Sequence, residues 1–189
     1  NPVLRGVSFE LDAGTMVGLV GENGSGKSVL MRIIAGSLTP DRGSITVEGR
    51  LGYCPQVPML YDKLTCDETF DLFGHAYRLG GTTTRERAHQ LYESLSFARF
   101  RAELVENLSG GTRQKLNLAI ALLHDPTVLL LDEPYAGFDW ETYQAFWSIA
   151  GSLRERGTTI LIISHFIQEQ ERFDQILRLK DGVLESGGH

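Results

Sequence analysis

The segment Gly21-Glu22-Asn23-Gly24-Ser25-Gly26-Lys27-Ser28 decides the fold class of this chain. The apolar run at residues 16–20 precedes it, and residues 29–35 follow it with apolar side chains at helical spacing. Glycines let the backbone curl so that successive N–H groups point at phosphate oxygens, and the start of the following helix adds its positive end. We therefore predict a strand, a phosphate-binding loop and a helix, with Lys27 neutralising the outer phosphates and Ser28 binding Mg²⁺.

Two other apolar runs support an α/β fold. Residues 128–131 and residues 159–163 are almost entirely aliphatic. Strands of this composition are typical of a parallel sheet that is covered by helices on both faces. Together with the strand, loop and helix around Lys27, they predict an α/β core with a mainly parallel sheet, of the kind found in P-loop NTPases.

The middle of the chain lacks a strand pattern and is predicted to be helical. Residues 65–68 match a helix capping box, and a second helix is predicted to begin after residue 83 or 84. We expect a single domain, divided into a core of residues 1–56 and 126–189 and an inserted helical lobe at about residues 57–125.

The C-terminal part predicts a helix and a hairpin. Beyond Asp139, aromatic and apolar side chains recur on one helical stripe, which predicts a core-facing helix. This stripe consists of Tyr143, Phe146, Trp147, Ala150 and Leu153. Residues 176–185 read as two short strands that turn at Asp181-Gly182.

Composition excludes several classes of protein. The chain has 189 residues, and no stretch of it approaches the roughly 18 consecutive apolar residues of a membrane helix, so a membrane link has to come from another chain or segment. The net charge of -6 argues against a dedicated nucleic-acid binder, which usually presents a basic face. Cys54 and Cys66 lie in unrelated contexts, which indicates a reducing compartment and no cysteine metal site. Because the chain starts at Asn1, we expect an N-terminal truncation.

Two carboxylates follow a buried strand. Asp132 and Glu133 come directly after the aliphatic run at residues 128–131, at the sheet edge where α/β proteins bind ligands. Phosphoryl transfer depends on in-line positioning and charge neutralisation. We predict that Asp132 holds the Mg²⁺ shell and that Glu133 orients or deprotonates the attacking water.

A second glycine-rich helix start lies at Leu108-Ser109-Gly110-Gly111. Ser109 can cap the helix, and the paired glycines leave backbone N–H groups open to a phosphate. One nucleotide cannot easily use both glycine-rich helix starts of a single chain. A two-fold dimer, in which each site uses the partner's Ser109 loop, is the natural solution.

With both glycine-rich loops and the acidic pair in this order, the chain resembles an ABC ATP-binding cassette along nearly its whole length. The resemblance implies three further site residues. Gln56 matches the glutamine that senses the γ-phosphate and Mg²⁺, and His165 matches the switch histidine that contacts the γ-phosphate. Asp139 matches the aspartate that reaches across the dimer interface.

The chain departs from the family pattern in two places. Thr112 stands where the Ser109 loop, the family's signature loop, commonly carries glutamine, so that one side-chain contact differs while activity is expected to remain. The aromatic residue that stacks on adenine in the family is expected upstream of Asn1. We therefore expect this stretch alone to bind nucleotide more weakly than the complete domain, because stacking on a base contributes roughly 1 to 3 kcal/mol in nucleic-acid binders.

The resemblance also implies a function. Two such domains clamp two ATP molecules head to tail with Mg²⁺, hydrolyse them and drive transport through transmembrane subunits. The implied partner is a second cassette, identical or different, and the implied location is the cytoplasmic face of the membrane, as a peripheral protein. The sequence is more similar to bacterial exporter cassettes than to sugar importers. The apolar residues 57–61 are the candidate contact with the transporter. The alternative is that they pack within the helical lobe.

Two other functions agree less well with the sequence. ABC ATPases that act on DNA or ribosomes carry long coiled coils, zinc-binding cysteine clusters or a second linked cassette, and this sequence contains none of these features. The loss of Glu133 or His165 would have favoured a regulatory subunit that binds ATP without turnover. Both residues are present, which counts against that function.

Overall fold

The computed structural model describes residues 3–164 and 167–185, and its centre is a mainly parallel sheet. The strands are β1 (Met16–Val20), β2 (Leu51–Cys54), β3 (Val128–Asp132), β4 (Thr159–Ile163), β5 (Gln175–Lys180) and β6 (Val183–Leu184). They lie in the order β2-β3-β4-β1-β5-β6, and only the β5–β6 pair is antiparallel. The predicted α/β fold with a mainly parallel sheet is confirmed.

Both faces of the sheet are covered, as its aliphatic strands require. Along β3, Leu129 and Leu131 belong to one hydrophobic cluster and Leu130 to the other, because successive side chains of a strand point to opposite faces. Helix α1 (Lys27–Ile34) packs on the Leu130 side, and α5 (Trp140–Glu155) packs on the opposite side. The stripe predicted for α5 lies in or against the core.

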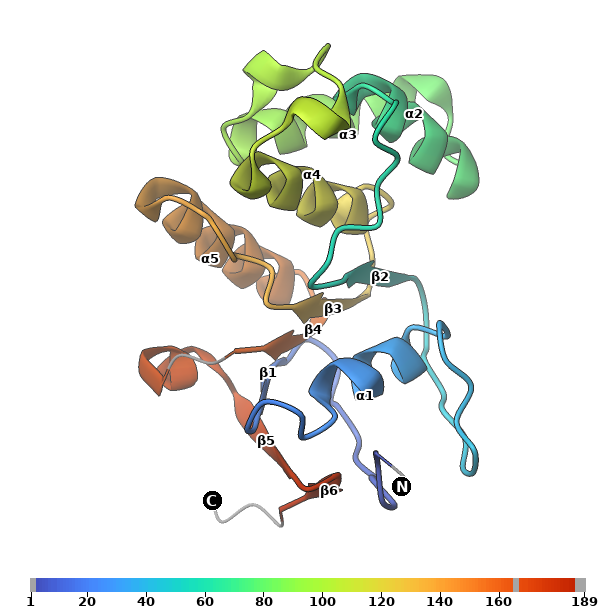
Figure 1. Cartoon of the computed structure of the whole chain (residues 1–189), viewed down its shortest axis with the longest axis vertical. Helices are drawn as coiled ribbons and strands as arrows, with labels where there is room; N and C mark the ends of the chain where they lie inside the picture. The colour runs from blue at the N-terminus through green and yellow to red at the C-terminus, as the bar shows by residue number, and fades with distance from the viewer. Residues whose placement is uncertain (1–2, 165–166, 186–189) are drawn as a thin grey trace.

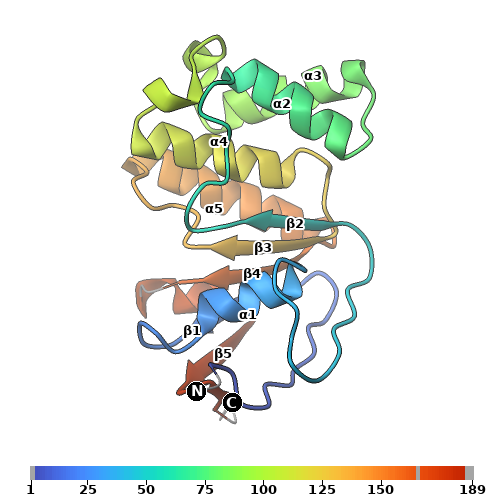
Figure 2. The ribbon, with the colours of Figure 1, turned by 45° about the vertical axis from the view of Figure 1, so that its right-hand side comes forward.

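The remaining helices lie together beyond the β2 edge of the sheet, as Figures 1 and 2 show. They are α2 (Cys66–Ala76), α3 (Gly81–Ser94) and α4 (Gly110–Leu122), with short 3-10 turns at η1 (Ala98–Phe100) and η2 (Val105–Asn107). A further 3-10 turn, η3 (Ile167–Arg172), precedes β5. The helices α2, α3 and α4 contact one another, and α4 also contacts β2, so α4 joins this group of helices to the sheet.

Local signals set the start of α2, whereas they misplace the start of α3. The predicted capping box is confirmed: Thr65 accepts a hydrogen bond from the Glu68 backbone, and the Glu68 side chain accepts one from Thr65. The predicted start of α3 after residue 83 or 84 is wrong, because α3 begins at Gly81. Thr84 does not cap the helix; its hydroxyl donates back to the carbonyl of Gly80 at 3.1 Å.

The predicted C-terminal hairpin is confirmed. β5 and β6 pair through Leu179 with Leu184 and Lys180 with Val183. Asp181 and Gly182 both have positive φ angles, of 47° and 77°, which is the geometry of the tight hairpin turn that Asp-Gly favours. The antiparallel β6 ends this side of the sheet.

His124 is a buried histidine that links the end of α4 to β2. Its ring stacks on Tyr77 with 4.0 Å between centroids, and its Nε2 lies 3.0 Å from the carbonyl oxygen of Leu51. Burial is the largest cause that lowers the pKa of His124; the Leu51 hydrogen bond opposes it, Arg50 and Arg87 lower the pKa further, and Asp125 raises it least. The folded protein therefore favours the neutral ring.

This burial predicts a loss of stability in acid. Below the ordinary histidine pKa of about 6.5, His124 binds a proton more readily in the unfolded chain than in the folded chain. The free energy of unfolding therefore decreases as pH falls below that value. Urea denaturation at pH 7.5 and pH 5.0 measures this decrease. We expect a smaller decrease in His124→Gln, and the wild-type decrease in His75→Gln, since His75 is exposed. Equal pH dependence in all three proteins would contradict the prediction.

Candidate functional site

The phosphate-binding loop is shaped by its glycines and by close packing against β5. A side chain at Gly21 would collide with the carbonyl oxygen of Leu179. Gly26 caps α1 with a φ of 103°, a left-handed conformation that other residues adopt only under strain. The loop therefore requires glycine at these two positions, and α1 begins immediately after it at Lys27.

Lys27 points back into the loop. Its Nζ donates hydrogen bonds to the carbonyl oxygens of Gly21 at 2.7 Å and of Glu22 at 2.9 Å. The residue is buried, with 6% of its surface exposed. Burial lowers the pKa of Lys27, while the negative charges of Glu133 and Asp132 raise it. The ammonium group thus lies within electrostatic reach of both carboxylates that the sequence assigned to this site.

The acidic pair lies where the sequence predicted it, at the end of β3. Asp132 is the last residue of the strand and is 2% exposed. Glu133 follows in the left-handed region with a φ of 50°, which is unusual for a residue other than glycine. Strained backbone of this kind is concentrated at functional sites. The strand end therefore places a buried carboxylate next to a partly exposed one.

Gln56 lies two residues beyond the end of β2, the strand next to β3. β2 and β3 are parallel, and Cys54 pairs with Leu131, so that the residues after each strand emerge at the same edge. Gln56 is exposed and is the second residue of the segment 55–62, which we call the glutamine loop. Burial raises the pKa of the Cys54 thiol, and the charge of Asp132 raises it further. The end of β2 is therefore close enough to Asp132 to feel its charge.

The predicted Ser109 loop forms the start of α4. The hydroxyl of Ser109 accepts a hydrogen bond from the backbone of Thr112 at 3.2 Å and lies 2.9 Å from the Thr112 hydroxyl. Ser109 is thus the expected helix cap, and Thr112 adds a side-chain contact to that cap. Ser109 and Gly110 are exposed, and Gly110 has no neighbour that an added side chain would meet.

Asp139 begins α5 and is linked to α4. Its carboxylate accepts hydrogen bonds from the backbone and hydroxyl of Thr142, both at 2.8 Å, and lies 3.6 Å from Nζ of Lys115. These interactions, with the Thr142 backbone bond first, hold the pKa of Asp139 below its usual range. The sequence did not indicate this capping role. A close approach of Gly111 to the carbonyl of Gly137 also holds the start of α4 against the segment before α5.

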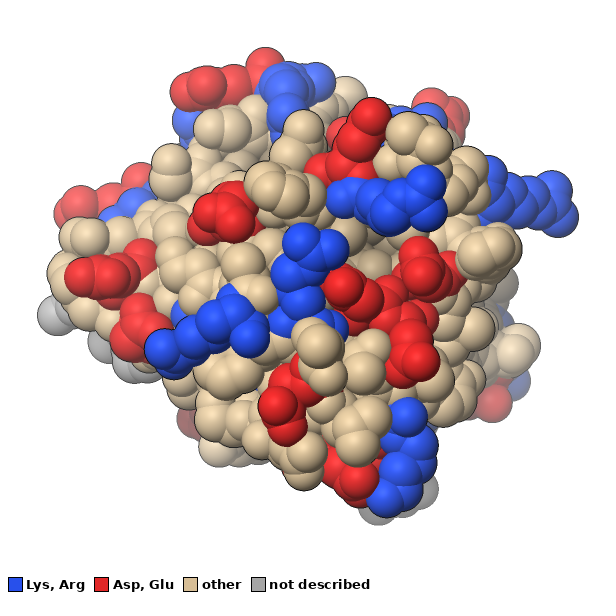
Figure 3. Space-filling view, turned by 90° about the horizontal axis from the view of Figure 1, so that it is seen from above, with Lys and Arg blue, Asp and Glu red and all other residues tan. Residues whose placement is uncertain are grey.

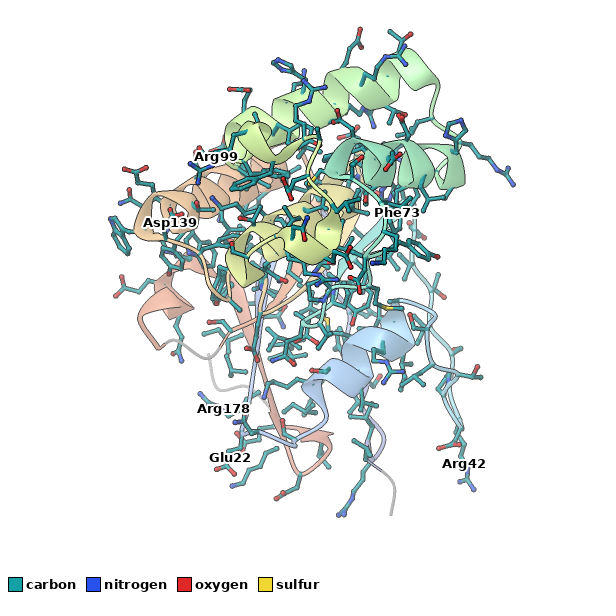
Figure 4. The ribbon with its side chains drawn as sticks, turned by 45° about the horizontal axis from the view of Figure 1, so that its top comes forward. Glu22, Arg42, Phe73, Arg99, Asp139 and Arg178 are labelled. Atoms are coloured by element: carbon teal, nitrogen blue, oxygen red, sulfur yellow. The ribbon has the colours of Figure 1, made fainter. Side chains whose placement is uncertain are left out.

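The helix starts and strand ends that carry the site residues lie on one side of the molecule (Figure 1). In Figure 1, the starts of α1 and α4 and the ends of β2 and β3 face the same side. Figure 4 places Glu22 of the phosphate-binding loop and Asp139 on this side, with Arg42 on the opposite one. Both glycine-rich helix starts and the acidic pair therefore share one side. His165, which the family resemblance assigned to the γ-phosphate, lies outside the described residues.

Sequence reasoning missed the polar residues of α4 that face the sheet. Gln114 and Asn117 are 3% and 5% exposed, and both lie within hydrogen-bond distance of the Cys54 thiol. The available signal was their spacing of three residues on a helix whose other buried positions are mostly apolar. Arg113, whose guanidinium pairs with Asp62, was also missed.

The donor atoms at this edge suit Mg²⁺. Ser28 offers a hydroxyl in the first turn of α1, and Asp132 offers a buried carboxylate. Mg²⁺ prefers oxygen ligands and is usually held by one or two protein groups together with phosphate oxygens and water. Within residues 3–164 and 167–185, no group of three or more His, Cys, Asp or Glu side chains could hold a metal ion.

Comparison with known proteins identifies the class. The family model "ABC transporter" matches residues 4–136, which is more than half of the chain. The chain therefore belongs to the ABC transporter family and is an ATPase domain of that family, as its motifs indicated.

Particular relatives narrow the description to the ATP-binding components of transporters. The chain is 39% identical to "Nod factor export ATP-binding protein I" of Rhizobium meliloti (strain 1021), over 96% of this chain and 58% of that protein. It is 36% identical to "Probable multidrug ABC transporter ATP-binding protein YbhF" of Escherichia coli (strain K12), over 97% of this chain and 34% of that protein. The chain thus spans less than two thirds of the length of these relatives.

Solved structures confirm the fold. The "ATP binding subunit of ABC transporter" superposes with a TM-score of 0.91 at 28% identity, covering 98% of this chain and 83% of that one. A dimeric ATP-binding cassette in a post-hydrolysis state, bound to ADP and Pi, superposes with a TM-score of 0.90 at 27% identity, covering 97% of this chain and 89% of that one. The P-loop NTPase fold predicted from the sequence is confirmed.

Proposed function

We propose that this chain binds ATP and Mg²⁺, dimerises head to tail around the nucleotide, and hydrolyses it to drive transport through transmembrane subunits. The observation that carries the proposal is the meeting of three elements on one side of the fold. These are the phosphate-binding loop, the acidic pair at the end of β3 and the exposed helix start at Ser109. Resemblance to a dimeric cassette bound to ADP and Pi supports the two-chain arrangement.

In the proposed site, nucleotide binding uses the whole loop from Gly21 to Ser28. Backbone N–H groups of Glu22, Asn23, Gly24, Ser25 and Gly26 cradle the phosphates, and Lys27 exchanges its two carbonyl contacts for phosphate oxygens. Ser28, Asp132 and Gln56 hold the Mg²⁺, which supplies charge neutralisation on the phosphate oxygens.

Hydrolysis depends on Glu133 in this proposal. Its carboxylate, next to the buried Asp132, accepts a proton from the water that attacks the γ-phosphate or orients that water. Gln56 and His165 contact the γ-phosphate that this water attacks. The left-handed backbone of Glu133 supports this role, because it departs from the extended conformation of β3.

The second half of each site comes from the partner chain. Ser109, Gly110 and Gly111 are proposed to bind the γ-phosphate of the nucleotide held by the other cassette, and Asp139 to contact the partner's phosphate-binding loop. The exposure of Ser109 and Gly110 supports this role, since both remain accessible on the isolated chain. The partner cassette can be identical or a different subunit.

A pair of Ser109 variants tests the composite site. Ser109→Asp keeps a good helix cap but places a negative charge against the partner's γ-phosphate, so we expect ATP turnover to drop about 100-fold with stability retained. Ser109→Ala, which loses the cap, should lower turnover about 10-fold, and Ser152→Ala on the exposed part of α5 should leave turnover unchanged. Wild-type turnover by a stable Ser109→Asp protein would contradict the composite site.

The glutamine loop is the proposed contact with the transmembrane subunits. Val57 and Met59 are each 75% exposed and Tyr61 is 61% exposed, whereas Leu60 packs against the core. Three exposed apolar side chains at alternate positions of one loop favour a protein partner. No helix in the described part of the chain is long and apolar enough to span a bilayer. We propose that the chain binds from the cytoplasmic face as a peripheral subunit.

Nucleic acid is not among the proposed partners. Figure 3 shows basic and acidic side chains interspersed over the face formed by α2 and α3, without one dominant sign of charge. A mixed surface of this kind provides no continuous basic track for a phosphate backbone. Export is the proposed direction of transport, supported by similarity to a Nod factor export protein.

A further inference from the structure

Helix α4 makes a set of polar contacts to the glutamine loop that the proposed function does not explain. Three polar side chains toward the middle of α4 are buried: Gln114 is 3% exposed, Lys115 8% and Asn117 5%. Burying an amide costs free energy unless its hydrogen bonds are satisfied. Asparagine is also a poor residue for a helix interior. A buried asparagine in the middle of α4 therefore needs a local reason.

The Asn117 amide finds its partners where β2 leads into the glutamine loop. Its Nδ2 donates to the carbonyl oxygen of Pro55 at 2.8 Å and lies 3.2 Å from Sγ of Cys54. The Pro55 carbonyl belongs to the peptide bond that leads directly into Gln56. Gln114 supports this contact, since its Oε1 lies 3.4 Å from the same Nδ2.

The far end of the loop is held by the same helix. Arg113 of α4 pairs with the Asp62 carboxylate; a second contact comes from η2, where the backbone N–H of Glu106 donates to the Asp62 carbonyl at 3.1 Å. Between these two anchors lie Gln56 and the exposed apolar side chains at positions 57, 59 and 61. The helix that starts with the Ser109 loop thus fixes both ends of the segment that carries Gln56.

We propose that Asn117 is a positioning residue that holds the Pro55 carbonyl and thereby fixes Gln56 relative to Asp132 for ATP hydrolysis. The inference rests on the proposed function of Gln56. Because β2 and β3 end side by side, a small shift of the Pro55–Gln56 peptide changes the distance from Gln56 to the Asp132 carboxylate. Asn117 also couples any displacement of the Ser109 loop to Gln56. Ser109 caps α4, which carries Asn117, and Asn117 bonds to the residue before Gln56.

A double-mutant cycle in the full-length protein tests this role. Asn117→Ala should lower kcat for ATP about 5- to 10-fold, the cost of one lost hydrogen bond to a positioned group, and should change KM less than about 2-fold. In a Gln56→Ala background the same substitution should lower kcat by less than about 1.5-fold, because Asn117 acts through Gln56. Asn117→Ser, which retains a donor, should recover part of the lost rate.

Two further measurements make the result decisive. Asn107→Ala is the matched control, because Asn107 is exposed and its amide donates to the surface carboxylate of Glu103; it should leave kcat unchanged. Amide hydrogen exchange of residues 56–61 should become faster in Asn117→Ala, with the thermal unfolding midpoint showing that the protein is folded.

The outcomes separate the two proposals. If Gln56→Ala leaves kcat unchanged, the proposed role of Gln56 fails. If Gln56→Ala lowers kcat but folded Asn117→Ala does not, Asn117 has no positioning role. Equal losses from Asn117→Ala in both backgrounds would also overturn the inference, since they would show that Asn117 acts independently of Gln56.

Discussion

Replacing Glu133 by Gln is expected to lower ATP turnover about 100- to 10,000-fold, the range that general-base catalysis supplies. The amide has nearly the size of the carboxylate but cannot accept a proton from water. Lys27 and Asp132 are unchanged, so ATP affinity should stay within a few-fold of the wild type. Steady-state phosphate release gives the turnover, and equilibrium titration with ATP gives the affinity.

Glu155→Gln is the control for this substitution. Glu155 lies exposed at the end of α5, so the same chemical change there should leave turnover at the wild-type rate. Undiminished hydrolysis by Glu133→Gln would remove Glu133 from its proposed role and would assign the proton to another group.

Replacing Lys27 by Ala is expected to weaken ATP binding about 10- to 100-fold, because each hydrogen bond to a charged group contributes about 1.5–3 kcal/mol. Turnover at limiting ATP should fall at least as far. Lys27 is buried and donates to the carbonyls of Gly21 and Glu22, so we also expect a loss of about 1 kcal/mol of stability. Isothermal titration measures the affinity, and urea denaturation measures the stability.

Lys180→Ala distinguishes a specific effect from a change in net charge. Lys180 is exposed on β5 and pairs with Glu185 on the surface. Its loss changes the net charge by the same amount but should leave ATP affinity within about 2-fold, because an exposed ion pair contributes little. Equal ATP affinity in Lys27→Ala and the wild type would contradict the phosphate-binding role of the loop.

Features that depend on local sequence were predictable. The strand, glycine loop and helix around Lys27 follow from a short contiguous pattern, and the aliphatic strand before Asp132 could be placed because a parallel sheet buries both of its faces. The Thr65 capping box needed only four adjacent residues. Because β1 and β3 both run parallel to β4, the phosphate-binding loop after β1 and the acidic pair after β3 lie at one edge of the sheet.

Features that depend on distant partners were not predictable. Asn117 meets the Pro55 carbonyl, a partner 62 positions away, and no local pattern indicates that contact. Lys115 pairs with Asp139 only because the fold places the start of α4 beside the start of α5. The start of α3 was misplaced for a different reason: Thr84 can cap a helix or bond back to a preceding carbonyl, and sequence does not distinguish the two.

The measurement that tests the two-chain clamp most directly is the mass of the Glu133→Gln protein by light scattering, with ATP and Mg²⁺ and again with ADP and Mg²⁺. The account predicts twice the mass of a single chain with ATP, because the unhydrolysed nucleotide joins the phosphate-binding loop of one chain to Ser109 of the other. It predicts a single-chain mass with ADP. A single-chain mass at saturating ATP, with ATP binding intact, would contradict the composite site.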